Sequence, residues 1–174
     1  MSATPLPALE TRYAGCRFRS RLEARWAVLF DHLDIRWEYE AEGFDTPAGN
    51  YLPDFRVKLD AIDRPGPMRW SWFEVKREDA EDDPRHAAFT QLGVGDLWVA
   101  RGLPSSARDQ WRRQWLTRYR LPWRDDPESY ILVHYGFVGW PVLARPRIGT
   151  EQPFDDEPLD VAFAAARSFR AGEP

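Results

Sequence analysis

Cysteine, histidine and lysine are all scarce in this sequence of 174 residues. The single cysteine, Cys16, cannot form an internal disulfide, and this favours a reducing compartment. The three histidines, His32, His86 and His134, are scattered and lack the spacing of zinc ligands. A glycine-rich loop of the kind that cradles phosphates is missing as well. These absences disfavour a disulfide-stabilised protein, a zinc protein and a P-loop nucleotide-binding protein.

Long apolar runs are also absent. No run approaches the roughly 18 residues that a membrane-spanning helix requires. The first twenty residues do not combine a charged start with an apolar stretch, which is the pattern of a signal peptide. We therefore expect a cytoplasmic protein with no membrane partner.

The charged residues are unevenly distributed among types. Of the 24 basic residues only two are lysines, Lys58 and Lys76, and the net charge is −4. This balance argues mildly against a protein that coats DNA, but a nuclease needs acids wherever it holds metal. Apolar residues make up 43% of the chain and nine residues are tryptophan, which is enough for a packed core. The length predicts one domain.

Two alternating stretches, residues 51–59 and 70–76, predict a β-hairpin with a turn over 61–67. A hairpin symmetric about Arg64 pairs position 54 with 74, 55 with 73 and 57 with 71. Asp54 and Glu74 then become cross-strand neighbours about 5 Å apart, with Lys76 on the same face. Two carboxylates that bind a divalent cation, with a lysine beside them, suit metal-assisted phosphodiester hydrolysis. The alternative is an exposed cross-strand ion pair.

Two local features qualify this hairpin and the segment before it. Pro53 cannot donate to a strand ladder, so it favours an edge or a bend.

Ser20 begins an amphipathic helix, and Glu23 lies at the border of its apolar stripe. Ser-x-x-Glu is also a capping box, in which Glu23 would accept a hydrogen bond from the Ser20 amide. The stripe consists of Leu22, Trp26, Leu29, Phe30 and Leu33.

The remaining elements follow from periodicity and capping residues. We expect a strand over 37–44, a helix over 82–92 capped by Asp83, a strand over 97–101, a helix from Ser105 or Ser106 to about Tyr119, two strands within 129–144 and a final helix over 158–170. That helix would turn Leu159, Ala162, Phe163 and Ala166 inward. Residues 1–14 and the last four are expected to be loose.

Four segments together resemble the PD-(D/E)XK nuclease superfamily: Phe18–Ala27, Trp37–Glu40, Tyr51–Phe55 and Phe73–Lys76. The sequence is most similar to small bacterial and phage members and to the nuclease domain of a transposon's endonuclease subunit. The resemblance implies an α/β, restriction-endonuclease-like core over 15–101, formed by a helix, a three-strand meander, a helix and a strand. Residues 102–174 would form an α+β extension packed on this core.

The resemblance also implies roles for individual residues. Asp54, Glu74 and the carbonyl of Val75 would bind Mg²⁺ or Mn²⁺, and Lys76 would orient the attacking water. Glu23 would hold a metal-bound water or a second ion.

We therefore expect a metal-dependent DNA endonuclease. One rival function is a catalytically silent subunit of the same fold that binds DNA or a partner in a larger recombination, replication or defence complex. Another is a protein-docking domain that uses the tryptophan-rich second half.

A basic cluster near the first helix is expected to contact DNA phosphates, with a solvated helix face as the alternative. It consists of Arg17, Arg19, Arg21 and Arg25.

Overall fold

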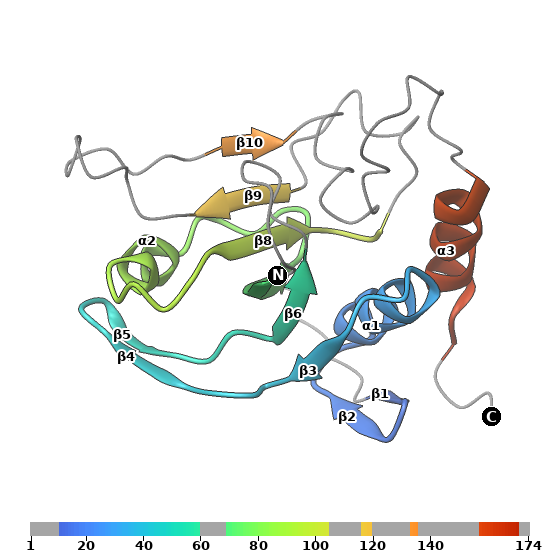
Figure 1. Cartoon of the computed structure of the whole chain (residues 1–174), viewed down its shortest axis with the longest axis horizontal. Coiled ribbons are helices and arrows are strands. Elements are labelled where there is room, and N and C mark those ends of the chain that lie inside the picture. Colours follow the sequence, from blue (N-terminus) through green and yellow to red (C-terminus); the bar gives the residue numbers. More distant parts are fainter. Residues whose placement is uncertain (1–10, 60–68, 105–115, 120–132, 136–156, 171–174) are drawn as a thin grey trace, which may run out of the picture.

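A mixed β-sheet separates two layers of helices in the computed structural model of this chain (Figure 1). The structure describes residues 11–59, 69–104, 116–119, 133–135 and 157–170. The helices are α1 (Arg21–His32), α2 (Pro84–Thr90) and α3 (Glu157–Ser168). The main sheet has the order β10 (Val133–Tyr135), β9 (Leu116–Tyr119), β8 (Leu97–Arg101), β7 (Arg69–Lys76), β6 (Phe55–Leu59), β3 (Trp37–Tyr39). The mixed α/β class expected from the sequence is confirmed.

The predicted register of the central hairpin is confirmed. Phe55 pairs with Phe73 and Val57 pairs with Ser71 in the antiparallel ladder of β6 and β7. The apolar alternation specifies this register, because a slip by one residue would turn each buried side chain to the other face. β8 runs parallel to β7 and starts and ends where the sequence predicts.

The strand expected from Tyr51 onward is interrupted at Pro53. Tyr51 ends β5 (Gly49–Tyr51), which pairs with β4 (Phe44–Thr46) in a separate hairpin, and β6 starts only at Phe55. Proline has no amide proton for the ladder, so the chain bends there as its position suggests. The expected strand over 37–44 is likewise too long. It ends at Tyr39, and Glu40 adopts a left-handed φ of 46° that cannot continue a strand.

The loose segment expected over 1–14 is wrong for its last residues. β1 (Thr11–Tyr13) and β2 (Cys16–Phe18) form an antiparallel hairpin. The two residues between them, Ala14 and Gly15, have φ of 47° and 79°, which is the backbone shape that a two-residue hairpin turn requires.

The two faces of the main sheet bury different clusters. One face packs against α1 and α3, which lie side by side (Figure 1). Its core includes Phe18, Trp26, Phe30, Phe55, Phe73, Trp98 and Phe163. The other face packs against α2 and the β4–β5 hairpin through Phe44, Tyr51, Trp72, Phe89, Leu97 and Val99. The hairpin and α2 therefore cover one end of the face that carries Glu74.

The predicted capping residues of α1 and α2 are confirmed. Ser20 caps α1, and the side chains of Trp26, Leu29 and Phe30 are fully buried. Asp83 caps α2, with Pro84 at the first helical position, although α2 is shorter than the predicted 82–92.

The helix predicted to end near Tyr119 is wrong at its end. Leu116–Tyr119 is strand β9, which pairs antiparallel with β8, and the first part of the expected helix lies outside the described residues. β10 falls within the predicted 129–144 and pairs with β9, while the second strand expected there also lies outside the described residues.

The final helix is present as α3, and Ala162, Phe163 and Ala166 are buried as predicted. No helix of the described ranges is long and apolar enough to cross a membrane.

Candidate active site

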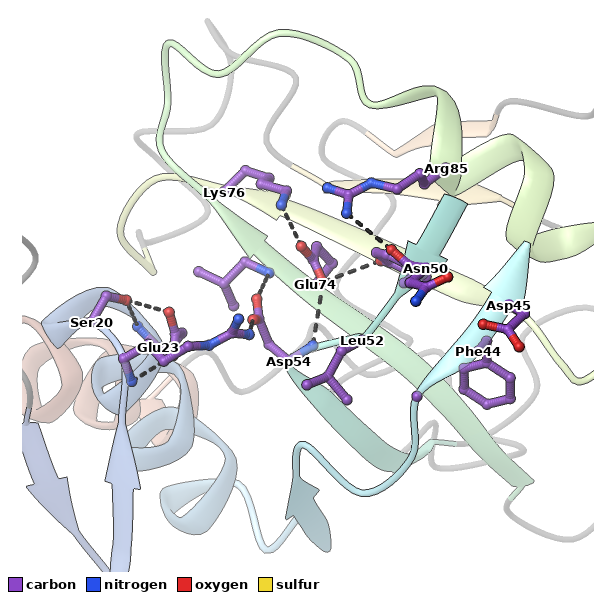
Figure 2. A pocket seen from close by; sticks show the side chains of 14 residues that line it. Ser20, Glu23, Phe44, Asp45, Asn50, Leu52, Asp54, Glu74, Lys76 and Arg85 are labelled. Carbon is purple, nitrogen blue, oxygen red and sulfur yellow. Dashed lines mark hydrogen bonds and ion pairs between the residues drawn. The ribbon is translucent and has the colours of Figure 1, made fainter. Parts of the chain in front are cut away.

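The four predicted catalytic residues line one pocket of about 700 Å³ (Figure 2). Glu23 enters it from α1, Asp54 from the residue before β6, and Glu74 and Lys76 from the end of β7. The β4–β5 hairpin and α2 form the opposite wall, with Phe44, Asp45, Asn50, Leu52 and Arg85. The structure thus brings together residues that lie more than fifty positions apart in the chain.

Asp54 is 4% exposed and both of its carboxylate oxygens are hydrogen-bonded. Oδ2 accepts from the Val75 amide at 2.7 Å, and Oδ1 accepts from Arg19 Nη2 at 2.9 Å. The ladder of β6 and β7 ends at Phe55–Phe73, so the Asp54 side chain takes the place of a strand partner for Val75. The bend at Pro53 therefore positions this carboxylate at the open end of the hairpin.

Glu74 is 4% exposed and lies in the centre of the pocket. Its Oε1 pairs with Lys76 Nζ. Its Oε2 accepts from the Tyr51 hydroxyl at 3.1 Å and from the Asp54 amide at 3.3 Å. The predicted closeness of Asp54, Glu74 and Lys76 is therefore present, but both acids are buried and Lys76 is half-buried, so they do not form an exposed surface pair.

Glu23 is 7% exposed, and its main chain and its side chain make different contacts. The Glu23 amide donates to Ser20 Oγ at 3.2 Å, which is the expected N-cap bond. The carboxylate differs from the expected capping box: it accepts from the Arg19 amide at 3.1 Å and from the hydroxyls of Ser20 and Tyr39, each at 2.6 Å. Capping thus holds Glu23 in place while its carboxylate lines the pocket.

The electrostatics of the pocket favour the neutral form of Asp54. Burial raises the pKa of Asp54 well above its usual value, and the nearby carboxylates of Glu74 and Glu23 raise it further. The Val75 amide and the Arg19 guanidinium act in the opposite direction. Burial and Glu74 also raise the pKa of Tyr51, so its hydroxyl keeps the proton that it donates.

The donor set suits a hard divalent cation. The pocket offers carboxylate oxygens from Asp54 and Glu74, the type of ligand that Mg²⁺ and Mn²⁺ prefer. The Val75 amide faces the β6 side of β7, because it donates to Asp54, whereas Trp72 and Lys76 bond toward β8. The carbonyl of a strand residue points to the same side as its amide, so the Val75 carbonyl also faces the pocket.

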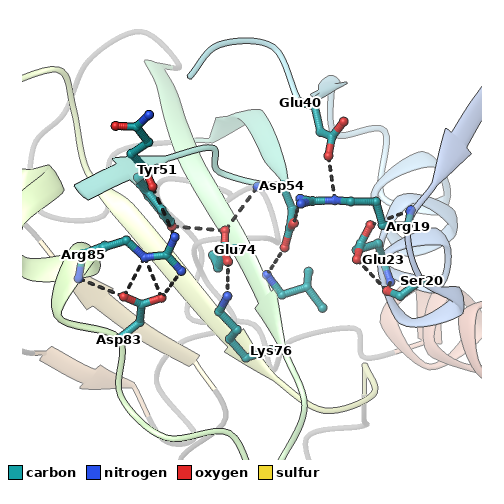
Figure 3. Close-up of polar contacts among 12 residues, drawn as sticks. Arg19, Ser20, Glu23, Glu40, Tyr51, Asp54, Glu74, Lys76, Asp83 and Arg85 are labelled. Atoms are coloured by element: carbon teal, nitrogen blue, oxygen red, sulfur yellow. Dashed lines mark hydrogen bonds and ion pairs between the residues drawn. The ribbon is translucent and has the colours of Figure 1, made fainter. Parts of the chain in front are cut away.

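The arrangement of these oxygens is nevertheless not that of a preformed metal site. Within the residues that the structure describes, no group of three or more histidine, cysteine or acidic side chains could hold a metal ion. Arg19 and Lys76 instead pair with Asp54 and Glu74 (Figure 3). The chemistry of the donors fits the ion, although one oxygen of each carboxylate is already paired with a cationic side chain.

The predicted basic cluster is divided by the structure. Arg17 belongs to β2, Arg19 precedes the cap of α1, and Arg21 and Arg25 lie one turn apart on α1. Of the four, Arg19 alone lines the pocket. Burial, together with Arg21, lowers the pKa of Arg25, and no hydrogen-bond partner for the buried Arg25 Nε was found among the described residues.

Several pocket residues were not predicted from the sequence. The sequence assigns no role in the site to Tyr51, which lines the pocket, or to Tyr39, which does not line it, yet each donates to a predicted catalytic acid. Arg85 extends from α2 across the pocket wall and donates to the Asn50 carbonyl at 3.2 Å and to Asp83. Apart from the Arg85–Asp83 pair, these contacts join positions at least 16 residues apart in the chain, and no local pattern signals them.

Comparison with known proteins gives no assignment: neither a protein-family model, nor a curated protein, nor a solved structure matches this chain.

Proposed function

We propose that this protein is a metal-dependent DNA endonuclease with a restriction-endonuclease-like core. The observation that carries the proposal is the convergence of Glu23, Asp54, Glu74 and Lys76 on one pocket. The order of elements supports it: α1, the antiparallel strands β3, β6 and β7, then α2 and the parallel strand β8. The sequence motifs Tyr51–Phe55 and Phe73–Lys76 are each weak evidence. That their acids line the same pocket adds support that the sequence alone lacks.

The residues have distinct roles in this proposal. Asp54, Glu74 and the carbonyl of Val75 would hold Mg²⁺ or Mn²⁺. The ion, when bound, polarises the scissile phosphate and acidifies water. Lys76, freed from Glu74, places its ammonium beside the attacking water and stabilises the negative charge that develops on the phosphate. Glu23, held by Ser20 and Tyr39, accepts a hydrogen bond from water on the α1 side of the pocket.

Cleavage of labelled DNA in Mg²⁺, in Mn²⁺ and in chelator tests the proposal. We expect cutting only with metal, and a loss of about 10²-fold or more in Asp54→Asn, Glu74→Gln and Lys76→Ala. Lys58→Ala is the matched control, because Lys58 is the only other lysine and does not line the pocket. Full activity in the three pocket variants would contradict the assignment of the site.

A panel of linear, branched and single-stranded DNA, with an RNA arm, would identify the nucleic acid that is cut. The pocket residues act on the phosphodiester group that all these substrates share, so preference among them must come from surfaces outside the pocket.

A second function, a catalytically silent subunit that binds DNA or a partner protein, has one observation in its favour. Each carboxylate oxygen of Asp54 and Glu74 already has a hydrogen-bond or ion-pair donor from the protein itself, so both carboxylates have partners without a metal. Salt-dependent DNA binding with no cleavage of any substrate in the panel would support this function over the first. The rival based on the tryptophan-rich second half falls mainly on residues outside the described ranges.

A further inference from the structure

Arg19 is the cationic side chain that pairs with one carboxylate oxygen of Asp54, a predicted metal ligand (Figure 3). Its Nη2 lies 2.9 Å from Asp54 Oδ1, and its Nε lies 2.7 Å from Glu40 Oε1. Its main chain is held in place, because its amide donates to Glu23 at 3.1 Å and to the Tyr39 hydroxyl at 3.0 Å. The side chain is 55% exposed, so the guanidinium can leave the pocket while the backbone stays fixed.

A guanidinium and a divalent cation at the same carboxylate oxygen repel each other, and the repulsion is strong in a buried pocket. Binding of the ion through Asp54 therefore displaces Arg19. The displaced guanidinium remains tethered at the pocket mouth, and a guanidinium binds phosphate through two parallel hydrogen bonds. The scissile region of a nucleic acid supplies such phosphates at the same place.

We infer that Arg19 is an exchangeable counterion, which neutralises Asp54 in the metal-free protein and binds a substrate phosphate once metal has displaced it. This inference rests on the proposed function. It assigns two opposite effects to one side chain: Arg19 opposes metal binding and assists DNA binding.

Arg85 provides a matched comparison from the same pocket. It lines the opposite wall and also pairs with a carboxylate, but that carboxylate is Asp83, which is not a predicted metal ligand. Loss of either arginine removes one positive charge near the pocket and so strengthens cation binding through space. Only the loss of Arg19 frees a ligand oxygen.

Titration calorimetry with Mn²⁺ in the absence of DNA tests the first effect. We expect Arg19→Gln to bind Mn²⁺ about five- to tenfold more tightly than the parent, since a charge-assisted hydrogen bond at a half-exposed site no longer competes. Arg85→Gln should change the affinity by less than about twofold. Arg19→Lys keeps the charge, but a single ammonium cannot pair with Asp54 and Glu40 through two separate nitrogens as the guanidinium does. Its affinity for Mn²⁺ should therefore fall between those of the parent and Arg19→Gln. Equal gains in Arg19→Gln and Arg85→Gln would overturn the inference.

Duplex binding in a Lys76→Ala background, where the duplex stays intact, tests the second effect. We expect Arg19→Gln to weaken binding about fivefold with Mn²⁺ present, and less in chelator, where Asp54 already engages Arg19. Equal weakening under both conditions would show that Arg19 does not exchange between the two partners. If neither the parent nor Arg19→Gln binds Mn²⁺, the proposed function fails and this inference fails with it. Metal binding by the parent without a specific effect of Arg19 overturns the inference alone.

Discussion

Asp54 and Glu74 are joined by reciprocal hydrogen bonds between main chain and side chain. The Asp54 amide donates to Glu74 Oε2 at 3.3 Å, and the amide that follows Glu74, that of Val75, donates to Asp54 Oδ2 at 2.7 Å. This exchange continues the β6–β7 pairing beyond its last ladder pair, with carboxylates in place of carbonyls. It holds two buried acids side by side, and the charge of Glu74 therefore adds to burial in raising the pKa of Asp54.

The first prediction concerns the pH dependence of metal-free stability. Burial, Glu74 and Glu23 raise the pKa of Asp54 in the folded protein above its value of about 3.9 in the unfolded chain. The stability that Asp54 contributes is then complete below about pH 4 and is lost as the pH rises through its folded pKa. Asp54→Asn lacks this loss, so its melting temperature relative to the parent should increase with pH. Each 1 kcal/mol of difference corresponds to about 2–4 °C.

Calorimetric scans of chelator-treated protein between about pH 4, near the unfolded pKa, and about pH 8, well above it, measure this effect. Asp45→Asn is the control, because Asp45 lines the same pocket but is exposed. The test is how the melting-temperature difference between variant and parent changes with pH, not its size at one pH. Asparagine cannot accept from both the Val75 amide and Arg19, and this shifts the melting temperature at every pH. A temperature difference that stays constant across the pH range would mean that Asp54 is not a buried acid beside two others.

The second prediction concerns stabilisation by metal. With a site of about 1 mM affinity, about 10 mM Mg²⁺ adds roughly 1.4 kcal/mol to the free energy of unfolding by mass action. For a chain of this length this is about 3–6 °C in melting temperature. Asp54→Asn and Glu74→Gln should lose most of the gain, and Lys58→Ala should keep it. Parallel shifts in all four proteins would indicate a general salt effect.

The third prediction separates helix capping from a role in the pocket. Ser20→Ala removes the acceptor of the Glu23 amide and one donor to the Glu23 carboxylate, and it should cost about 1 kcal/mol, or about 2–4 °C. Glu23→Gln keeps an acceptor for the Arg19 amide, so it should melt close to the parent. Its activity should fall by at least about tenfold, which is about 1.4 kcal/mol of transition-state free energy. Unchanged cleavage by Glu23→Gln would leave Glu23 with a capping role only.

The fourth prediction concerns Arg21 and Arg25, whose like charges lie one turn apart on α1. Burial, together with the charge of Arg21, lowers the pKa of Arg25. A phosphate between them would relieve this repulsion. Removal of one arginine–phosphate ion pair reduces the salt dependence of log K for duplex DNA by about 0.9, so the double alanine variant should show a slope smaller by about 1.8. Exposed Arg36, beyond the end of α1, provides the control variant. If the slope of the double variant matches that of the parent, the two arginines form a solvated helix face.

Periodic and local features could be predicted from the sequence. The alternation over 51–59 and 70–76 predicts the β6–β7 register, because only one register buries Phe55 against Phe73. Ser20 and the stripe after it predict α1 and its first residue, since a cap and an apolar face depend on neighbours within a few positions. These two elements position Glu23, Glu74 and Lys76, three of the charged residues that line the pocket.

The same reasoning fails where the fold overrides a local pattern. Trp111, Trp115 and Tyr119 have helical spacing, yet Leu116–Tyr119 pairs with β8 as a strand. The free edge of β8 is satisfied by this pairing, and intrinsic propensity is too weak to oppose it. β3 ends before Glu40, and the β1–β2 hairpin turns at Ala14, because both residues have left-handed φ angles. Alanine and glutamate rarely adopt such angles, so the sequence does not predict them.

Tertiary structure alone determined which residues of the pocket pair with one another. The contacts Arg19–Asp54, Tyr39–Glu23 and Tyr51–Glu74 span 35, 16 and 23 positions. A sequence supplies the residue types that can make such contacts, but the distance between two side chains depends on where the folded backbone places them. The same holds for the pKa of Asp54, which depends on burial and on neighbours from other elements. The types of candidate catalytic residue were therefore readable from the sequence, whereas their hydrogen-bond partners and the raised pKa of Asp54 follow from the fold.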